Sequence, residues 1–236
     1  KVLKNRKLFH TLLRSAKLAQ KPLASGGFIR HLPMIFSKEQ NFRALPAIAP
    51  KAFRDLWPRI RPEVKGARLK VALFSGCVQD FVYPEQSVAA VNVVAGRGAA
   101  LDFPMEQSCC GLPVMMMGEM AAARDVAQQN ISALDPAKYD YILTLCASCA
   151  SHLKHGYQKL LGNDPSWAVR AKQFADKVID FSSFARDVLK LAPEDFRPGG
   201  GTATYHAPCH LCRGLGVIEA PRDLLRIAGV EYKPAE

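Results

Sequence analysis

The stretch Gln107-Ser-Cys-Cys-Gly111 decides how this sequence is interpreted, because two adjacent cysteines followed by glycine are rare by chance in a globular chain. Further cysteines flank it at a distance, one upstream and a C-x-x-C pair downstream. Thiolates are soft ligands that select zinc, copper(I) and iron–sulfur clusters, and C-x-x-C spacing lets two sulfurs reach one metal centre. A metal or iron–sulfur site is therefore predicted at Cys77, Cys109, Cys110, Cys146 and Cys149.

Each cysteine group follows an apolar stretch that is typical of a β-strand. Leu69–Phe74 precedes Cys77, Ala99–Phe103 precedes the Cys-Cys-Gly loop, and Tyr139–Leu145 leads into Cys146. Helices are expected over 86–94 and 119–134, and later over 150–161, from Ser166, and over 182–190, with a short strand at 178–180. This alternation predicts an α/β fold with a parallel sheet. Because ligands bind outside the carboxyl ends of such strands, the cysteine groups are expected to converge at one edge.

The region after a Pro-Gly-Gly-Gly linker looks like the beginning of a second copy of the same unit. Thr202–Cys209 can be aligned with Lys70–Cys77, and Val230–Pro234 with Ala100–Pro104. An internal repeat predicts what should follow, and here a second Cys-Cys-Gly would lie beyond Glu236. We therefore expect a basic, proline-rich arm over 1–68, a first cysteine-rich domain over 69–198, and the start of a truncated second one over 199–236.

The positive charge is concentrated at the start of the chain, whose formal net charge is +11. Residues 1–70 carry seventeen Lys and Arg side chains against three acidic ones. An amphipathic helix over roughly 5–20, followed by an irregular linker, is expected to dock on a neighbouring surface. No nucleic-acid motif accompanies the charge. No stretch is apolar enough to span a membrane, although peripheral association stays open, and an odd number of thiols without a signal peptide favours the reducing cytoplasm.

The ordered series C-x31-C-C-G-x34-C-x-x-C from Cys77 to Cys149 resembles the CCG, or cysteine-rich, domain family. That domain occurs in the B subunit of heterodisulfide reductase and in iron–sulfur subunits of related oxidoreductases. Tyr205–Gly216 and Asp180–Phe184 look most like its lactate-utilisation branch, and the resemblance covers about 69–236. In that branch some proteins carry a ferredoxin-type domain upstream. Since the chain begins with Lys1, it looks like a C-terminal fragment of such a fused protein.

The resemblance implies an iron–sulfur electron-transfer module of an oxidoreductase that oxidises a 2-hydroxy acid, L-lactate first, in a complex with other iron–sulfur or flavin subunits. It implies a [4Fe–4S] cluster on the five cysteines, as in heterodisulfide reductase, where full motifs bind the cluster in its non-cubane form. It also implies that Cys209 is a ligand of the incomplete second motif. Many members of the lactate branch lack the first cysteine of C-x-x-C. This chain has that cysteine, Cys146, so it differs from those members and matches the complete five-cysteine pattern. Whether this chain itself catalyses a reaction is left open.

Other interpretations of the cysteines remain open beside the cluster. Four of the thiolates would suffice for zinc, which gives a zinc-stabilised docking scaffold, and Cys146 with Cys149 would form a redox disulfide. Disulfide reduction, as in heterodisulfide reductase, would use the same cluster on another substrate. The neighbouring residues have structural interpretations: His152 and His155 cap or decorate a helix, His206 and His210 are hydrogen-bonded neighbours, Cys212 is a small buried residue, and Met115–Met117 cover the cluster.

Overall fold

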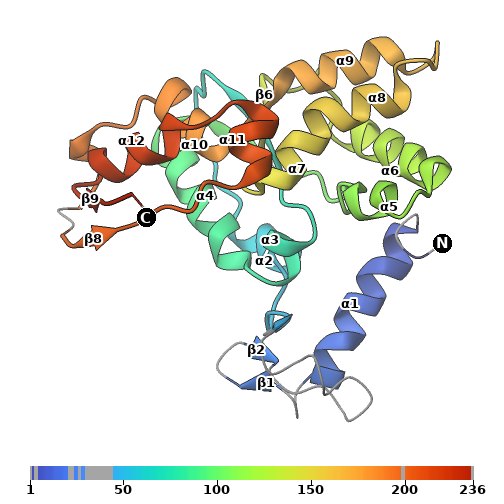
Figure 1. The fold of residues 1–236 in the computed structure, drawn as a ribbon, viewed down its shortest axis with the longest axis horizontal. Helices are drawn as coiled ribbons and strands as arrows, with labels where there is room; N and C mark the ends of the chain where they lie inside the picture. The colour runs from blue at the N-terminus through green and yellow to red at the C-terminus, as the bar shows by residue number, and fades with distance from the viewer. Residues whose placement is uncertain are drawn as a thin grey trace.

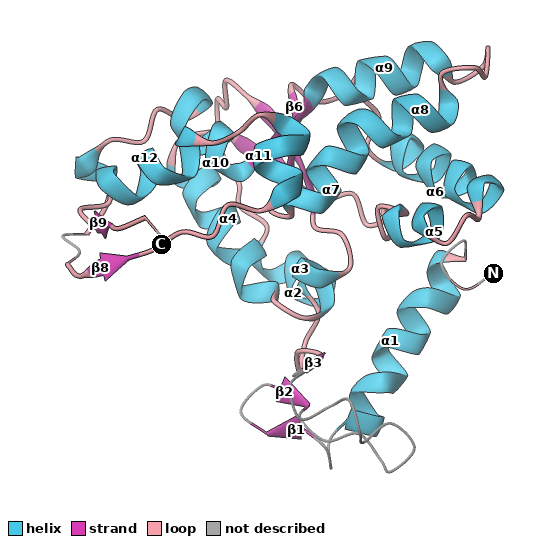
Figure 2. Ribbon diagram, in the orientation of Figure 1, coloured by secondary structure: helices cyan, strands magenta, loops and turns pink. Residues whose placement is uncertain are grey.

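A parallel sheet with helices on both faces forms the centre of the protein in the computed structural model, which describes residues 2, 5–20, 24–25, 28–29, 45–197 and 200–234 (Figures 1 and 2). Its strand order is β5-β4-β6-β7, and every neighbouring pair is parallel. The strands are β4 (Lys70–Phe74), β5 (Ala100–Asp102), β6 (Tyr141–Thr144) and β7 (Val178–Asp180). The α/β fold class predicted from the sequence is confirmed.

Alternate side chains of the central strand β4 enter two separate cores. Val71 and Leu73 pack on one face of the sheet, and Ala72 and Phe74 pack on the other. Successive side chains of a strand point to opposite faces, so an uninterrupted apolar run fits a strand that is buried on both sides. The first face is covered by α2 (Phe53–Ile60), α4 (Pro84–Gly96), α10 (Phe181–Ser183) and a π-helix (Phe184–Val188), and the second by α6 (Met120–Ala133), α8 (Tyr157–Leu161) and α9 (Ala168–Lys177).

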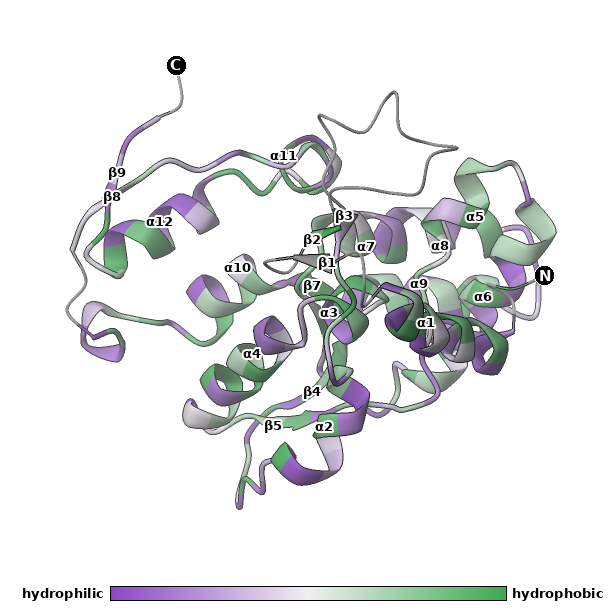
Figure 3. Cartoon of the chain, turned by 90° about the horizontal axis from the view of Figure 1, so that it is seen from below, coloured by the Kyte–Doolittle hydropathy of each residue, from purple (hydrophilic) through white to green (hydrophobic). Residues whose placement is uncertain are grey.

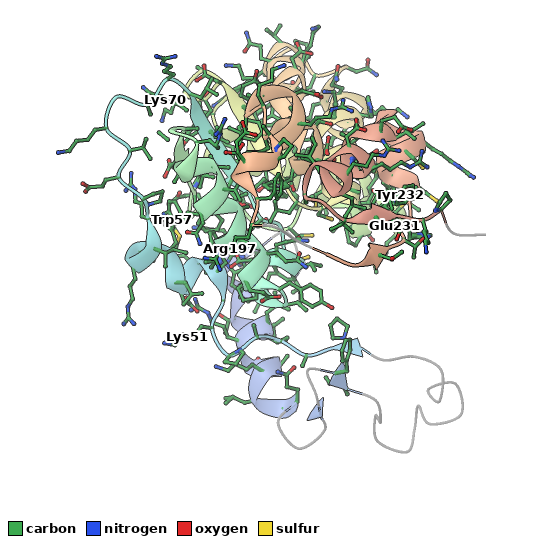
Figure 4. The ribbon with its side chains drawn as sticks, turned by 90° about the vertical axis from the view of Figure 1, so that its left-hand side faces the viewer. Lys51, Trp57, Lys70, Arg197, Glu231 and Tyr232 are labelled. Atoms are coloured by element: carbon green, nitrogen blue, oxygen red, sulfur yellow. The ribbon has the colours of Figure 1, made fainter. Side chains whose placement is uncertain are left out.

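Helix α2 corrects the prediction of an irregular linker after residue 20. It forms even though Pro58 lies inside it, because Phe53 and Trp57 are buried against Phe103, with ring centroids 4.9 and 5.9 Å apart. Trp57 is labelled in Figure 4. Proline lacks an amide hydrogen and disfavours a helix interior, but here tertiary packing outweighs that cost. Much of the remaining linker lies outside the described residues, apart from the short antiparallel strands β1 (Ala24–Ser25), β2 (Phe28–Ile29) and β3 (Leu45–Pro46).

The expected N-terminal helix is confirmed as α1 (Arg6–Gln20). In Figure 1 it lies at the periphery, beyond the helices that cover the sheet. Arg14 forms an ion pair with Asp55 of α2, and the side-chain amide of Gln20 both donates to and accepts from the backbone of Ile48. α1 therefore docks on α2 and on the segment that leads into it, and His10 of α1 also meets the Phe81 ring.

The C-terminal region forms a second, smaller parallel pair of strands, β8 (Thr202–Ala203) and β9 (Glu231–Tyr232), separated by α11 (Cys209–Leu215) and α12 (Glu219–Ile227). Figure 4 shows Lys70 of β4 and Glu231 and Tyr232 of β9 on opposite sides of the molecule, so the two sheets are separate. Strand, cysteine, helix and parallel strand follow in the order expected for a repeat. The second copy itself, and the domain boundaries at 68 and 198, remain predictions.

Four short elements follow the central strands and carry the cysteine loops, while a 3-10 turn (Pro193–Asp195) closes the first half. The predicted helix over 150–161 is built from two of these elements and α8 rather than from one helix, since a π-helical segment interrupts it. The four elements are α3 (Val78–Phe81), α5 (Leu112–Met116), α7 (Ala147–Ser151) and the π-helix His152–Gly156, which continues into α8.

Candidate metal centre

The first and last cysteine groups lie just beyond the carboxyl ends of the two central strands. Cys77 comes three residues after β4 ends and precedes α3, and Cys146 comes two residues after β6 ends and precedes α7. From β4 the chain crosses to β5 on one side, and from β6 to β7 on the other, so β4 and β6 flank the topological switch point of the sheet. Crevices at such points are the usual ligand sites of open parallel sheets.

Two glycines with positive φ let the backbone approach the cysteines. Gly76 has φ +65, and a Cβ atom there would lie 3.2 Å from the sulfur of Cys149. Gly111 has φ +87, and a Cβ atom there would lie 3.0 Å from the side chain of Val126. An L-residue is strained in this backbone region, so both positions favour glycine for conformation as well as for space.

The five thiols form one continuous series of neighbours. Side-chain interactions link Cys77 to Cys109, Cys109 to Cys110, Cys110 to Cys149, and Cys149 to Cys146. Cys109, Cys110 and Cys149 are buried, whereas the two ends of the series are partly exposed. Residues that are 72 positions apart in sequence thus share one sulfur-lined site, and all seven cysteines of the chain are free thiols.

This arrangement separates the pKa values of neighbouring thiols. Interactions with Cys110 and Cys77 outweigh burial and lower the pKa of Cys109 to about 3, and the interaction with Cys149 lowers the pKa of Cys146 to about 6. The pKa values of Cys77, Cys110 and Cys149 are raised by hydrogen bonding to these neighbours and by burial. Cys109, inside the series, and Cys146, at its end, are therefore the thiols whose lowered pKa values favour thiolate, the form that binds metals.

The donor set fits a metal centre by its chemistry. Five thiols with no carboxylate among them are soft donors, as iron–sulfur clusters and thiolate zinc sites require. In the described parts of the chain, no group of three or more Cys, His, Asp or Glu side chains is arranged to hold a metal ion as it stands. The thiols contact one another instead, and the assignment of these five cysteines as ligands remains a prediction.

Gln107, the first residue of the quoted stretch, joins the loop to the end of β4. Its side-chain oxygen accepts from the Ser75 amide at 3.0 Å, and its side-chain nitrogen donates to the carbonyls of Leu73 and Pro104 at 2.8 and 3.0 Å. The side chain is almost fully buried, so these bonds replace the water that it lost. Gln107 therefore fixes the Cys-Cys-Gly loop relative to the strand that precedes Cys77.

The side chains of Asn130 and Tyr157 form hydrogen bonds to the backbone around the cysteine pair. The sequence prediction identified neither residue. Asn130 accepts from the Ser108 amide at 3.0 Å and donates to the Cys109 carbonyl at 2.9 Å and to the Tyr157 hydroxyl at 2.8 Å. The Tyr157 hydroxyl donates to the Cys110 carbonyl at 2.9 Å. Both side chains are fully buried. Asn130 lies on the apolar face of the helix expected over 119–134, and a polar residue in such a position was the sequence signal that could have identified it.

The histidines near the loop differ from one another in burial. His152 is 4% exposed, which corrects the expectation that it decorates a helix surface, whereas His155 is exposed as expected. Burial lowers the pKa of His152 to about 4, so the ring is neutral. His210 of α11 is exposed, and its charge lowers the pKa values of Cys146 and His152. No separate role for His206 follows from the described residues.

The methionines after the loop do not all cover the site. Met115 packs against the core, but the side chains of Met116 and Met117 are 75% and 77% exposed. Helix α5 lies at the surface in Figure 1 and is mostly green, or hydrophobic, in Figure 3. The predicted cover is therefore confirmed for Met115 and wrong for its two neighbours.

Cys209 lies at the start of α11 and is exposed, outside the series of five interacting thiols. Cys212 is partly buried, as expected for a small residue on the next turn, and its sulfur lies 4.0 Å from the Cys209 carbonyl. Close packing of α11 on α7 brings this segment beside the site, since a Cβ atom at Gly214 would lie 2.7 Å from the Ser151 hydroxyl. The ligand role of Cys209 remains a prediction.

None of the helices in the described part of the chain is long and apolar enough to cross a membrane.

Comparison with known proteins places this site in a recognised domain. Residues 71–154 match the family model of the cysteine-rich domain named CCG. Lactate utilization protein A of Geobacillus kaustophilus (strain HTA426) is 39% identical over 168 residues, which cover 70% of this chain and 68% of that protein. The protein of the same name from Geobacillus sp. (strain WCH70) is 37% identical over 167 residues, with the same coverage, and that from Bacillus thuringiensis (strain Al Hakam) is 38% identical over 157 residues, covering 66% and 64%.

Proposed function

The chain belongs to the lactate utilization protein A family, and on that basis we propose that it is an iron–sulfur electron-transfer module in the oxidation of L-lactate. Oxidation of lactate to pyruvate releases two electrons and two protons, and an iron–sulfur cluster supplies one-electron transfer when it is bound. The observation that carries the proposal is the unbroken series of five thiols at the switch point of the parallel sheet.

The residues of this chain perform three tasks in the proposed role. The five thiols bind the metal centre, and the lowered pKa values of Cys109 and Cys146 favour the thiolate form that binding requires. Gly76 keeps the backbone close to the Cys149 sulfur without a side chain that would fill the space, and Gly111 lets the Cys-Cys-Gly loop pack closely on Val126. Burial of Cys109, Cys110 and Cys149 keeps water from the inner part of the site, which protects sulfur from oxidation and influences the reduction potential.

Anaerobic reconstitution of the chain with iron and sulfide tests the proposal. We expect a visible absorption spectrum and an electron paramagnetic resonance signal of an iron–sulfur cluster, with loss of iron in the Cys110→Ser and Cys149→Ser variants. Cys212→Ser, outside the series, should retain full iron and serves as the matched control. Binding of one zinc ion with no iron uptake would overturn the electron-transfer role and favour a zinc-stabilised scaffold.

The substrate and the partners require a separate measurement. We propose that other iron–sulfur or flavin subunits complete the pathway of electrons in the cytoplasm, and that the basic arm contributes to docking them. Supplying the reconstituted chain together with those subunits should give lactate-dependent reduction of an acceptor, which omission of the chain abolishes. Reduction of the acceptor by glycolate but not by lactate, or reduction of a heterodisulfide by the chain with no lactate-dependent activity, would contradict the assigned substrate.

A further inference from the structure

A buried polar atom faces the Cys-Cys-Gly loop without a partner. The Nε2 atom of His152 has no hydrogen-bond partner among the described residues, and the side chain is 4% exposed. Buried polar groups in native proteins are nearly always paired, so an orphan of this kind calls for a group that the polypeptide does not provide. The atom lies 3.9 Å from the position that a Cβ atom on Gly111 would occupy, which directs it at the loop that carries Cys109 and Cys110.

The ring of His152 is fixed in this orientation by its own helix. A Cβ atom on Gly156 would lie only 2.0 Å from Nδ1, so the imidazole rests directly against the Gly156 backbone in the π-helical turn. The Tyr157 ring meets it edge-on, with centroids 5.3 Å apart and an interplanar angle of 84°. The absence of a side chain at Gly156 thus leaves the room that the imidazole occupies in this π-helical turn.

The loop that this orphan faces contains Cys109, a sulfur whose partners change when metal binds. In the free-thiol protein, Cys109 interacts with the thiols of Cys77 and Cys110 and with the Gly111 amide. Metal binding removes protons from thiol ligands, so Cys77 and Cys110 can then no longer donate to Cys109. A buried thiolate that loses two donors has capacity for a new one, and the imidazole lies beside the loop, with Nε2 3.9 Å from the Cβ position of Gly111, the residue after Cys110.

We propose that His152 is a positioning residue of the metal centre, donating a hydrogen bond from Nε2–H to the Cys109 sulfur once that sulfur binds metal. This inference rests on the proposed function only in requiring a metal centre on the five cysteines. A hydrogen bond to a ligand sulfur stabilises the more electron-rich, reduced form of the centre. His152 therefore raises the reduction potential without being a ligand.

Potentiometric titration of the anaerobically reconstituted full chain tests the inference. We expect a lower midpoint potential in His152→Leu and partial recovery in His152→Gln, whose amide keeps a donor. Gly156→Ala, which displaces the ring without changing its chemistry, should lower the potential in the same direction. His155→Leu, on the exposed side of the same turn, is the matched control and should leave the potential unchanged.

Electron–nuclear double resonance of the wild-type protein provides a test that needs no variant to fold. An exchangeable proton coupled to the centre, lost in deuterium oxide and in His152→Leu, supports the hydrogen bond. Strong coupling to a nitrogen of His152 would instead show direct ligation and overturn the inference. Equal midpoint potentials in wild type, His152→Leu and Gly156→Ala, each with full iron content, would also overturn the inference. Absence of iron from the wild type would reject the proposed function as well.

Discussion

At the scale of single residues, the Cys-Cys-Gly loop depends on side chains that are not cysteines. Asn130 and Tyr157 bond to the backbone of Ser108, Cys109 and Cys110, and the Gln107 side chain ties the start of the loop to the end of β4. Buried networks of this kind are rigid only when every member is satisfied. The position of the sulfurs is therefore set by the second layer of residues as much as by the cysteines.

Asn130→Leu should strongly destabilise the protein. The substitution has similar volume but removes the acceptor of the Ser108 amide and the donor to the Cys109 carbonyl, and leaving these buried groups unpaired costs about 2–4 kcal/mol. Urea denaturation of the metal-free chain measures the effect. Asn92→Leu on the exposed side of α4 is the control, for which we expect a change below about 0.5 kcal/mol. Equal midpoints for the two variants would show that the network contributes no stability.

The second prediction for single residues concerns the buried ion pair between Arg54 and Asp80. Their side chains are 6% and 0% exposed, and the Asp80 carboxylate also accepts from the Arg54 amide at 3.0 Å. Burial raises the pKa of Asp80 even though Arg54 opposes the shift. Arg54→Met would leave a buried carboxylate without its cation, which costs about 3–5 kcal/mol near neutral pH.

The pH dependence of that variant has a definite sign. Without Arg54 the folded-state pKa of Asp80 rises further above its unfolded value, so folding takes up a proton and stability is lost as pH rises. The difference from wild type should thus be larger at pH 8 than at pH 5 in urea denaturation. Adding Asp80→Asn, which removes the charge but keeps an acceptor, should recover part of the loss. A pH-independent difference would contradict this account.

At the scale of elements, the sequence predicted those parts of the fold that depend on local pattern. The strands at β4, β6 and β7 and the helices α1, α4 and α6 lie where apolar periodicity placed them. Helix α2 could not be predicted in this way. Pro58 disfavours a helix, and the helix forms because its side chains pack against Phe103, which lies far away in the sequence. The π-helical turn at His152 could not be predicted from the sequence either, since the fit of its buried ring against Gly156 is a matter of three-dimensional packing.

Docking of α1 should weaken as the pH falls. His10 contacts the Phe81 ring, and burial together with Arg54, Arg6 and Arg14 lowers its pKa to about 3. Because the ordinary value is 6.5, the undocked helix binds a proton first, and docking is fully favoured only above that pH. Hydrogen exchange in α1, corrected for intrinsic rates, should be several-fold less protected at pH 5 than at pH 7.5. His10→Gln should abolish most of this difference, and an unchanged difference would reject the role of His10.

The contact of α11 with α7 depends on glycine at position 214, which has no side chain to collide with α7. A Cβ atom at Gly214 would lie 2.7 Å from the Ser151 hydroxyl but 3.4 Å from Ser151 Cβ, an ordinary contact distance. Gly214→Ala should therefore loosen α11 and reduce hydrogen-exchange protection over 209–215, and adding Ser151→Ala should restore it. Gly96→Ala, with open space around the new methyl group, is the control. Failure of Ser151→Ala to restore protection would show that the steric explanation is incomplete.

At the scale of the whole molecule, the two parallel sheets of the described residues differ greatly in size. The four parallel strands are covered on both faces, whereas β8 and β9 pair through two residues each and are exposed or only partly buried. The sequence predicted this imbalance from the alignment of Thr202–Cys209 with Lys70–Cys77. It could not show where the two sheets lie relative to each other, because that depends on helix packing rather than on a local pattern.

Stability should differ between the two halves accordingly. The β4 amides lie in the middle of the sheet and are expected to exchange only through global unfolding, whereas Thr202–Tyr205 can exchange when β8 separates locally from β9. Hydrogen exchange measured by mass spectrometry should show much greater protection at Val71–Phe74 than at Thr202–Tyr205. β7, a sheet edge that is nevertheless largely buried, is the control and should resemble β4 more closely than β8. If β8 were as protected as β4, the C-terminal region would have to unfold together with the first sheet, and its interpretation as a separate, incomplete repeat would be wrong.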